Sequence, residues 1–276
     1  MTTTTAEPVG ALLRGWRRRR RRSQLDVSIA AELSTRHLSC IETGRANPSR
    51  DMIRRLCDEL DVPLRERNSL YLAAGFAPVH SERAFDDLGA ARTAVEAVLT
   101  GHEPNPALAV NVRWEMLAAN RAMALFLADV PPELTRPPVN VLRATLHPDG
   151  LARRIRNLAQ WRAHVLRRIH RQLERTSAAG LAELLAELES YPVLSADPGE
   201  PAPDGSAGDL VVPLRLATEY GELALLYTTT VFGSPRDVTL DEIAIETFFP
   251  ADPQTAALMR AVTAQARSAE AASPEL

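Results

Sequence analysis

The side chains that could act as nucleophiles, acid–base groups or metal ligands are few in this chain and stand far apart. The two cysteines, Cys40 and Cys57, form no CxxC pair. The two nearest histidines, His164 and His170, are six residues apart, which places them about 120° apart around a helix. No GxSxG, HExxH or glycine-rich phosphate-binding motif occurs. The sequence therefore predicts no catalytic centre, metal site or cofactor, and it indicates that the protein is not an enzyme.

Arginine supplies every basic side chain, because the chain has no lysine. This excludes a phosphate-loop lysine, a lysine Schiff base and a lysine general base. The net charge of −3 over 276 residues conceals an asymmetry. Residues 1–80 hold 14 arginines against nine acidic residues (+5), and the remainder holds 18 against 26 (−8). This asymmetry favours a polyanion-binding head followed by a separate acidic body.

One arginine falls at a position where a charge is costly. Residues 150–176 have the spacing of one long amphipathic helix, and Arg162 lies near the middle of its apolar stripe. A buried guanidinium needs a partner, since an unpaired buried charge is very unfavourable. Glu174, the only acidic residue of this stretch, lies too far along the helix to pair with it. The partner is therefore an acid from another element, surface water reached by snorkelling, or the anion of a ligand.

From the third of these alternatives we predict that Arg162 holds an anionic headgroup in a cavity of the acidic body. The neighbouring side chains predicted to bind the ligand are Leu158, Trp161, Val165 and Ile169. His164, Arg167 and Arg171 are predicted to face away from this stripe. An internal ion pair or a snorkelling Arg162 stays open beside this hypothesis.

The elements that precede this region are five short helices within residues 9–76. Their predicted ranges are 9–16 followed by the arginine run 17–22, 23–31, 34–43, 49–60 and 64–74. Ser23, Ser34 and Ser49 each stand where a helix N-cap is expected. A three-residue turn, Glu32 to Ser34, joins the second and third helices, which is the geometry of a helix-turn-helix.

The third helix is the one that would enter the DNA major groove. If Leu38 and Ile41 face inward, the side chains between them point outward toward DNA. The predicted DNA-binding residues are Gln24, Thr35, Arg36, Ser39, Cys40, Thr43 and Arg45. Among them Arg36 suits a bidentate contact with guanine, and Gln24 suits a phosphate. The run Arg17–Arg22 is either a solvated charge run or a set of phosphate contacts.

The segment SQLDVSIAAELSTRHLSCIETGRANPS resembles the helix-turn-helix of the XRE (Cro/repressor-like) regulators, most specifically in IETGRANPS. Two positions depart from the usual pattern of that family. Arg22 stands where leucine is common, and Glu32 stands where glycine is common in the turn. Glu32 is expected to loosen the turn without changing the assignment.

The rest of the chain predicts a domain of mixed helices and strands. Two short strands lie within residues 107–120, three further strands lie within 209–249, and helices lie between them. Such an order is typical of an α+β domain with an antiparallel sheet. The stretch 195–208 is predicted to be a flexible loop from its proline, glycine and serine content.

A second resemblance covers this region. NVRWEMLAANRAM, PPVNVLRATLHPDGLARRIRNLAQWRAHVLRRIHRQLE and TTTVFGSPRDVTLDEIAIETFFPAD resemble the ligand-binding domain of the MmyB-like transcription regulators. This resemblance implies a PAS-like fold, with an antiparallel sheet and helices around an apolar cavity. It also implies a small-molecule sensor, with long-chain fatty acids as the suggested ligand class.

Together these observations predict an all-α five-helix DNA-binding bundle followed by an α+β PAS-like domain. The predicted domains are 9–78 for DNA binding, 79–106 as a helical linker, 107–262 for ligand sensing, and 263–276 as a disordered tail. The expected function is a ligand-responsive transcriptional regulator that binds double-stranded DNA as a homodimer, because a single head makes few base contacts. The alternative is a DNA-binding head fused to a protein-interaction module of the antitoxin or sigma-partner type. The order of charge and apolar residues at the start, and the lack of an apolar run of ~20 residues, predict a cytoplasmic protein without a membrane association.

Overall fold

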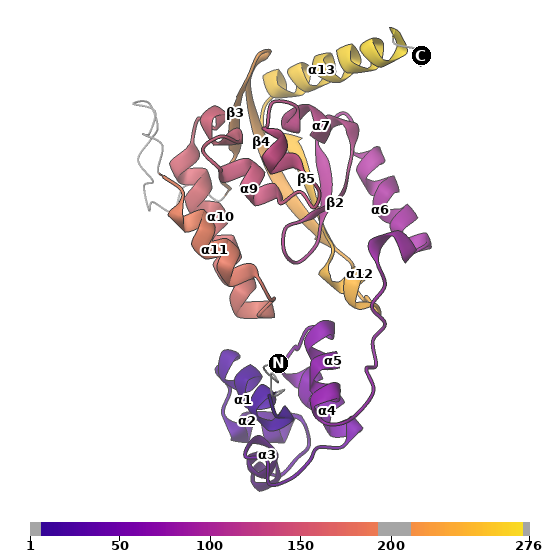
Figure 1. The fold of residues 1–276 in the computed structure, drawn as a ribbon, viewed down its shortest axis with the longest axis vertical. Coiled ribbons are helices and arrows are strands. Elements are labelled where there is room, and N and C mark those ends of the chain that lie inside the picture. Colours follow the sequence, from indigo (N-terminus) through magenta and orange to yellow (C-terminus); the bar gives the residue numbers. More distant parts are fainter. Residues whose placement is uncertain (1–6, 193–210, 273–276) are drawn as a thin grey trace. The chain divides into compact units, whose positions relative to one another are not determined.

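The structure, a computed structural model, describes residues 7–192 and 211–272 in two compact units (Figure 1). Of the described residues, the first unit comprises those up to Ala84 together with two short segments, Glu174–Thr176 and Gly233–Asp241. The second unit comprises the rest of the chain from Phe85. Within the described residues no helix is long and apolar enough to cross a membrane, and no cluster of side chains could hold a metal ion.

The first unit is built on the five helices that the sequence predicts. They are α1 (Val9–Arg19), α2 (Gln24–Ala30), α3 (Thr35–Glu42), α4 (Arg50–Glu59) and α5 (Leu64–Ala73). Ser23, Ser34 and Ser49 cap α2, α3 and α4, because each side chain accepts a hydrogen bond from the backbone N–H three residues on. The helices enclose one apolar core, which includes Leu13, Trp16, Leu38, Ile41, Ile53, Leu56 and Leu70.

Two backbone positions set how α3 is held. α1 crosses α3 closely at Gly10, where a Cβ atom would lie 2.1 Å from the carbonyl oxygen of Ile41. Glu32, in the turn before α3, has a φ of +54°, in the left-handed region that favours glycine. The turn therefore keeps the backbone of a glycine turn even though its residue carries a side chain.

The second unit is an α+β domain with a five-stranded antiparallel sheet, as predicted. The strands are β1 (Ala107–Val110), β2 (Met116–Ala119), β3 (Leu214–Thr218), β4 (Gly221–Val231) and β5 (Ala244–Pro250), in the order β2-β1-β5-β4-β3. The helical elements are η1 (Phe85–Asp87), α6 (Ala90–Gly101), α7 (Arg121–Leu127), α8 (Pro132–Thr135), α9 (Val141–Leu146), η2 (Leu151–Arg154), α10 (Leu158–Thr176), α11 (Leu181–Ser190) and α13 (Pro253–Ala272). Between β4 and β5, α12 (Val238–Glu242) lies in the segment that belongs, up to Asp241, to the first unit.

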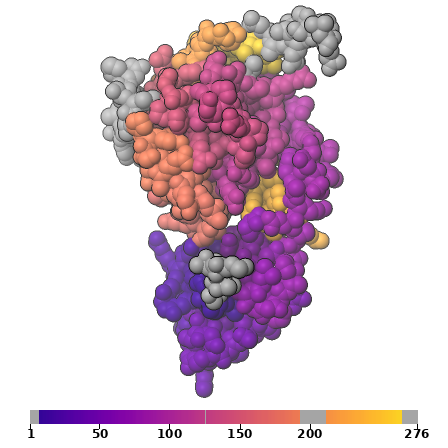
Figure 2. Space-filling view, viewed as in Figure 1, coloured from indigo at the N-terminus to yellow at the C-terminus, as the bar shows by residue number. Residues whose placement is uncertain are grey.

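These helices cover the curled sheet. α6 packs against β1, β2 and β5, and α13 packs against β4 and β5. Side chains of α7, α9 and α10 join those of β1, β3, β4 and β5 in one apolar core. In Figure 2 residues coloured magenta to orange, among them α7, α9 and α10, make up most of the second unit's surface on the face shown.

The prediction of one long helix over residues 150–176 is wrong at its start. η2 occupies Leu151–Arg154, and Ile155 is extended and forms a β-bridge with Leu216. The side chain of Asn157 then accepts a hydrogen bond from the Arg215 N–H and donates one to the Pro213 carbonyl. These contacts hold Ile155 extended and residues 156–157 in a turn, so α10 begins only at Leu158.

Two further ranges differ from the expectations. The predicted linker contains α6, which belongs to the second unit because it packs on the sheet. The predicted disordered tail from residue 263 is helical as far as Ala272, where the alanine-rich sequence favours a helix. The flexible loop predicted over 195–208 lies outside the described residues.

Candidate functional site

The outward face of α3 carries polar side chains at the positions that the sequence indicates. Arg36 and Thr43 are exposed, and Ser39 and Cys40 are half-buried between them. Arg45, just past the helix, is exposed and donates a hydrogen bond from Nε to Thr43 Oγ1. Leu38 and Ile41 are buried beneath this face. The inward and outward phases of the helix are confirmed, and contact of these residues with DNA stays a prediction.

Two of the predicted DNA-binding residues have partners inside the helical unit. Gln24 donates from Nε2 to Glu42 Oε2 at 2.8 Å. The Thr35 hydroxyl shares a 2.9 Å hydrogen bond with the hydroxyl of Ser28, which is buried. These bonds fix the junction of α2 with α3, so a phosphate contact of the Gln24 side chain would have to use the second N–H of its Nε2.

The arginine run 17–22 divides into two sets. Arg17 pairs with Glu42, Arg20 donates to the carbonyls of Leu60 and Asp61, and Arg22 donates to the carbonyl of Glu59. The arginines of the run that are exposed are Arg18, Arg19 and Arg21. Neither interpretation covers the whole run, because Arg17, Arg20 and Arg22 tie helices together. The exposed half faces solvent, and its contact with phosphates stays a prediction.

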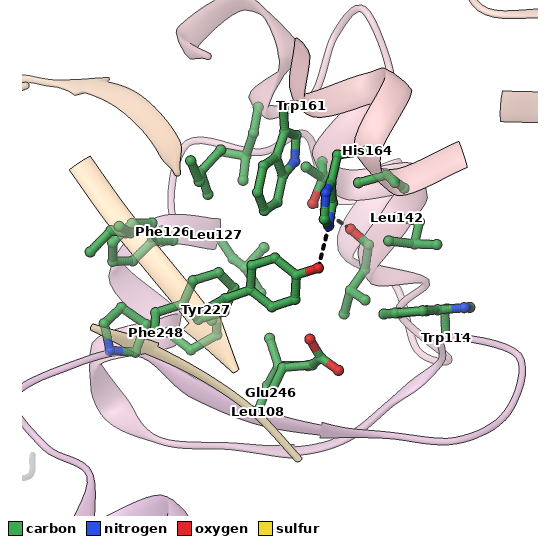
Figure 3. Close-up of a pocket in the computed structure, with 18 of the residues that line it drawn as sticks. Leu108, Trp114, Phe126, Leu127, Leu142, Trp161, His164, Tyr227, Glu246 and Phe248 are labelled. Carbon is green, nitrogen blue, oxygen red and sulfur yellow. Dashed lines mark hydrogen bonds between the residues drawn. The ribbon is translucent and has the colours of Figure 1, made fainter. Parts of the chain in front are cut away.

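The second unit contains an apolar cavity of about 90 Å³, several times the 10–15 Å³ that about one water molecule needs by the same measure. Its wall combines α7, α9 and α10 with strands from both halves of the sheet (Figure 3). Aliphatic and aromatic side chains make up most of the lining, including Leu108, Met123, Phe126, Leu127, Val141, Leu142, Val165, Leu225 and Phe248. Such a wall suits an apolar chain with few polar atoms.

One part of the cavity wall is polar. Arg168 of α10 donates to both carboxylate oxygens of Glu246 on β5, at 2.5 and 2.8 Å, and to the hydroxyl of Thr229 on β4 at 2.7 Å. Its guanidinium carbon lies over the rings of Trp114 (4.5 Å) and Tyr227 (5.2 Å). Glu246 is only 4% exposed and lies opposite Leu108 and Thr229 in the sheet. A buried ion pair therefore forms part of an otherwise apolar wall.

A second polar pair adjoins it. The hydroxyl of Tyr227 and Nε2 of His164 form a hydrogen bond (Figure 3). Burial lowers the pKa of His164, and the positive charges of Arg167, Arg168 and Arg171 lower it further. Burial likewise raises the pKa of Tyr227. Both shifts favour the uncharged forms, so this pair offers hydrogen-bonding atoms without a net charge.

Only two of the predicted ligand-binding residues line the cavity. Trp161 and Val165 line the cavity. Leu158 and Ile169 are not among its lining residues, and Ile169 is fully buried in the core behind it.

Arg162 is also absent from the lining, because its side chain turns to α11. Its Nη2 donates to the carbonyls of Leu188 and Glu189 at 3.2 and 2.9 Å. Those carbonyls belong to the last residues of α11, where basic side chains bind favourably. Among the described residues, the hydrogen-bond partners of Arg162 are thus helix-end carbonyls.

The face of α10 that lines the cavity consists of Trp161, His164, Val165 and Arg168. The prediction that His164 faces away is wrong, because the cavity-lining face lies about 100° round the helix from Arg162. Glu246 was missed entirely. Its signal in the sequence is one acidic residue inside the apolar strand AIETFFP, in the same phase as Phe248.

Comparison with known proteins identifies both units. The profile of the MmyB-like transcription regulator ligand binding domain matches residues 91–262, and that of a helix-turn-helix domain matches residues 8–70. The chain is also similar to the transcriptional regulator ClgR of two Mycobacterium tuberculosis strains, CDC 1551 / Oshkosh and ATCC 25618 / H37Rv. Each is 39% identical over 64 residues, which are 23% of this chain. The matched part spans 57% of the length of these relatives.

Proposed function

Because the chain belongs to the MmyB-like transcription regulators, as a DNA-binding regulator with a ligand-binding domain, we propose that its ligand is a small amphipathic, fatty-acid-like molecule. Binding of that molecule in the second unit would change the affinity of the helix-turn-helix for its DNA site. We further propose that the protein binds double-stranded DNA as a homodimer and that its second unit is a PAS-like sensor.

The observation that carries the proposed ligand class is the composition of the cavity wall. Figure 3 places Phe126 and Phe248 at one end of the cavity, and His164 and Trp114 toward the other. An apolar tail beside the phenylalanines would leave the polar head next to His164, Tyr227 and the Arg168–Glu246 pair. Each buried methylene group would contribute roughly 0.8 kcal/mol to binding.

The chain path supports a response of the first unit to such a ligand. β4 and β5 carry Tyr227 and Glu246, and the segment that connects these strands, Gly233–Asp241, belongs to the first unit. Within that unit Asp237 is buried and accepts hydrogen bonds from Ser81 Oγ and Arg83 Nε, at 2.9 and 3.1 Å. A shift of β4 against β5 would therefore pull on residues that follow α5.

α3 would be the helix that contacts the base edges of the DNA. Arg36 is exposed near its N-terminus, where recognition helices contact base edges. A single α3 reaches few base pairs, so two heads on paired half-sites would supply a useful specificity.

Two measurements on the full-length protein test this function. Selection from a random pool of DNA duplexes should enrich one sequence with two related half-sites. Native mass spectrometry of the purified protein, followed by solvent extraction, should find a co-purifying amphiphile. If no DNA sequence is enriched, the proposed reading head is wrong. If the protein carries no amphiphile and binds none that is added, the protein-interaction module is the better assignment for the second unit.

A further inference from the structure

We propose that the cavity accepts an amphiphile whose head is uncharged and bears an oxygen, such as an alcohol, an ester or an amide, and discriminates against a free carboxylate. This inference rests on the proposed function and narrows its ligand class. It is carried by the buried ion pair between Arg168 and Glu246, which both line the cavity.

Arg168, the one arginine among the described residues of the cavity wall, is already engaged by a carboxylate of the protein. Its two Nη atoms make three donations, two to Glu246 and one to Thr229. The two-pronged geometry with Glu246 is the strongest that a guanidinium makes with a carboxylate. A ligand carboxylate would have to displace Glu246 or share the guanidinium with it.

Either outcome is unfavourable in this place. Displacement would leave the Glu246 carboxylate, which is 4% exposed, buried without its cation. Sharing would put two negative charges beside one positive charge in an apolar cavity, where like charges strongly oppose each other's ionisation. His164 offers no compensating charge, because burial and the neighbouring arginines lower its pKa.

The remaining polar atoms of the wall suit an uncharged head. The hydroxyl of Tyr227 has His164 and Arg168 as partners, and its one donor and two acceptor positions leave room for a third. Trp161, another lining residue, has an indole N–H that is buried and makes no hydrogen bond with any described residue. A ligand oxygen that accepts from this N–H would satisfy it, and a buried donor without a partner is costly.

The test measures how tightly the wild-type protein binds three compounds that share a ten-carbon chain and differ in their head group. Decan-1-ol, methyl decanoate and sodium decanoate are titrated at about pH 8, where the acid is ionised. The fluorescence of the tryptophans reports binding, since Trp114 and Trp161 line the cavity. We expect the alcohol and the ester to bind at least about tenfold more tightly than decanoate, a difference of about 1.4 kcal/mol.

A charge-removing variant tests the cause. Glu246→Gln leaves Arg168 without its carboxylate, so decanoate should gain at least about tenfold in affinity while decan-1-ol changes little. The matched control is Glu222→Gln on the same sheet, because Glu222 pairs with Arg215 where both side chains are exposed. This control should bind all three compounds as the wild type does.

The outcomes separate this inference from the function on which it rests. If wild-type protein binds decanoate as tightly as decan-1-ol, the inference is overturned while the sensor stands, whether or not Glu246→Gln folds. A decanoate affinity that stays unchanged in folded Glu246→Gln also overturns it. If none of the three compounds binds the wild type, the proposed amphiphile sensor fails, and the inference fails with it.

Discussion

The carboxylate of Glu42 and the guanidinium of Arg17 join α3 to α1 by a two-pronged ion pair inside the helical unit. Arg17 Nε lies 2.6 Å from Oε1, and Nη2 lies 2.8 Å from Oε2. Glu42 is the one charged residue of α3 that is buried, and Gln24 of α2 donates to its second oxygen. Three helices therefore meet at one buried carboxylate, which stands at the last residue of α3.

Glu42→Gln should destabilise the first unit by about 3 kcal/mol, since it leaves the guanidinium of Arg17 without its charge partner. Hydrogen exchange of peptides within residues 9–76, measured by mass spectrometry on the whole chain, would show this as lost protection. The control Glu59→Gln breaks the more exposed pair with Arg22 and should cost under about 1 kcal/mol. Equal effects of the two variants would contradict the structural role of Glu42.

The same carboxylate gives the first unit a pH dependence. Burial by itself raises the pKa of Glu42, but the hydrogen bonds from Arg17 and Gln24 and the positive charge of Arg17 outweigh it, so the pKa is lowered. Its stabilisation is therefore complete above the unfolded pKa of about 4.3 and is lost as the pH falls through the lower folded value. In Glu42→Gln this part of the acid sensitivity of the unit should disappear.

Glu32→Gly should stabilise the first unit by about 0.5–1 kcal/mol. Glu32 has a φ of +54°, which costs an L residue roughly 1–2 kcal/mol, and glycine adopts it without strain. The greater freedom of glycine in the unfolded chain offsets part of the gain. The matched control is Ala30→Gly in the neighbouring helix, which should destabilise by about 0.5–1 kcal/mol. Hydrogen exchange of the first unit measures both variants. A loss of protection in Glu32→Gly would mean that the exposed ion pair of Glu32 with Arg55 stabilises the unit by more than the backbone strain at Glu32 costs.

Arg36→Ala should weaken binding to the selected DNA site by about 1–3 kcal/mol and relax the preference at one base pair. Fluorescence anisotropy with the selected site and with single-base variants measures both effects. Arg54→Ala is the control, because Arg54 is exposed on α4 and pairs with Asp51 and Asp58. An equal loss on selected and random DNA would show that α3 docks in another way.

Replacing both Arg18 and Arg21 with alanine should weaken the binding of all DNA sequences alike. It should also flatten the dependence of DNA affinity on salt concentration. Both side chains are exposed, unlike those of Arg17, Arg20 and Arg22, so they can reach phosphates without breaking the helical unit. The slope of log affinity against log salt concentration, taken on random DNA, shows how many phosphates the variant no longer neutralises. An unchanged slope would contradict phosphate binding by the run.

The two cysteines should differ sharply toward iodoacetamide at about pH 8. Burial raises the pKa of the Cys57 thiol to about 12, so almost none of it is a thiolate. Cys40 is half-buried on the outward face of α3 and should take up one adduct. Intact-protein mass spectrometry should find that adduct and should show that the selected DNA slows its formation. Modification of Cys57 in the folded protein would contradict its burial.

The first unit was predictable because its signals are local. Each capping serine, and the inward positions of Leu38 and Ile41, follow from residues within one helical turn. The departure from glycine at Glu32 was also visible in the sequence, although we expected a loosened turn rather than the left-handed backbone that Glu32 keeps. Local signals could not predict that Arg17 and Gln24 donate hydrogen bonds to Glu42, because Glu42 lies 25 and 18 residues away from them in the sequence.

The polar part of the cavity wall could not be predicted from the sequence for the same reason. Arg168 meets Glu246 across 78 residues, and only the pairing of β5 with β1 and β4 brings that carboxylate to α10. Arg162 was chosen because it lies on the apolar stripe of α10, but the stripe does not show that the cavity borders Trp161, His164, Val165 and Arg168 instead. Its partners are backbone carbonyls of α11, which leave no mark in a sequence pattern.

The most direct test of ligand-controlled DNA binding is the affinity of the full-length protein for its selected DNA site with and without saturating decan-1-ol. It is measured by anisotropy for the wild type and for Val165→Phe, which adds a ring where Val165 lines the cavity. We predict that decan-1-ol changes the wild-type affinity at least about fivefold, a coupling of about 1 kcal/mol. We also predict that Val165→Phe binds DNA as the unliganded wild type does and does not respond. A wild type whose DNA affinity stays unchanged while decan-1-ol is bound, or a filled variant that responds like the wild type, would contradict this function.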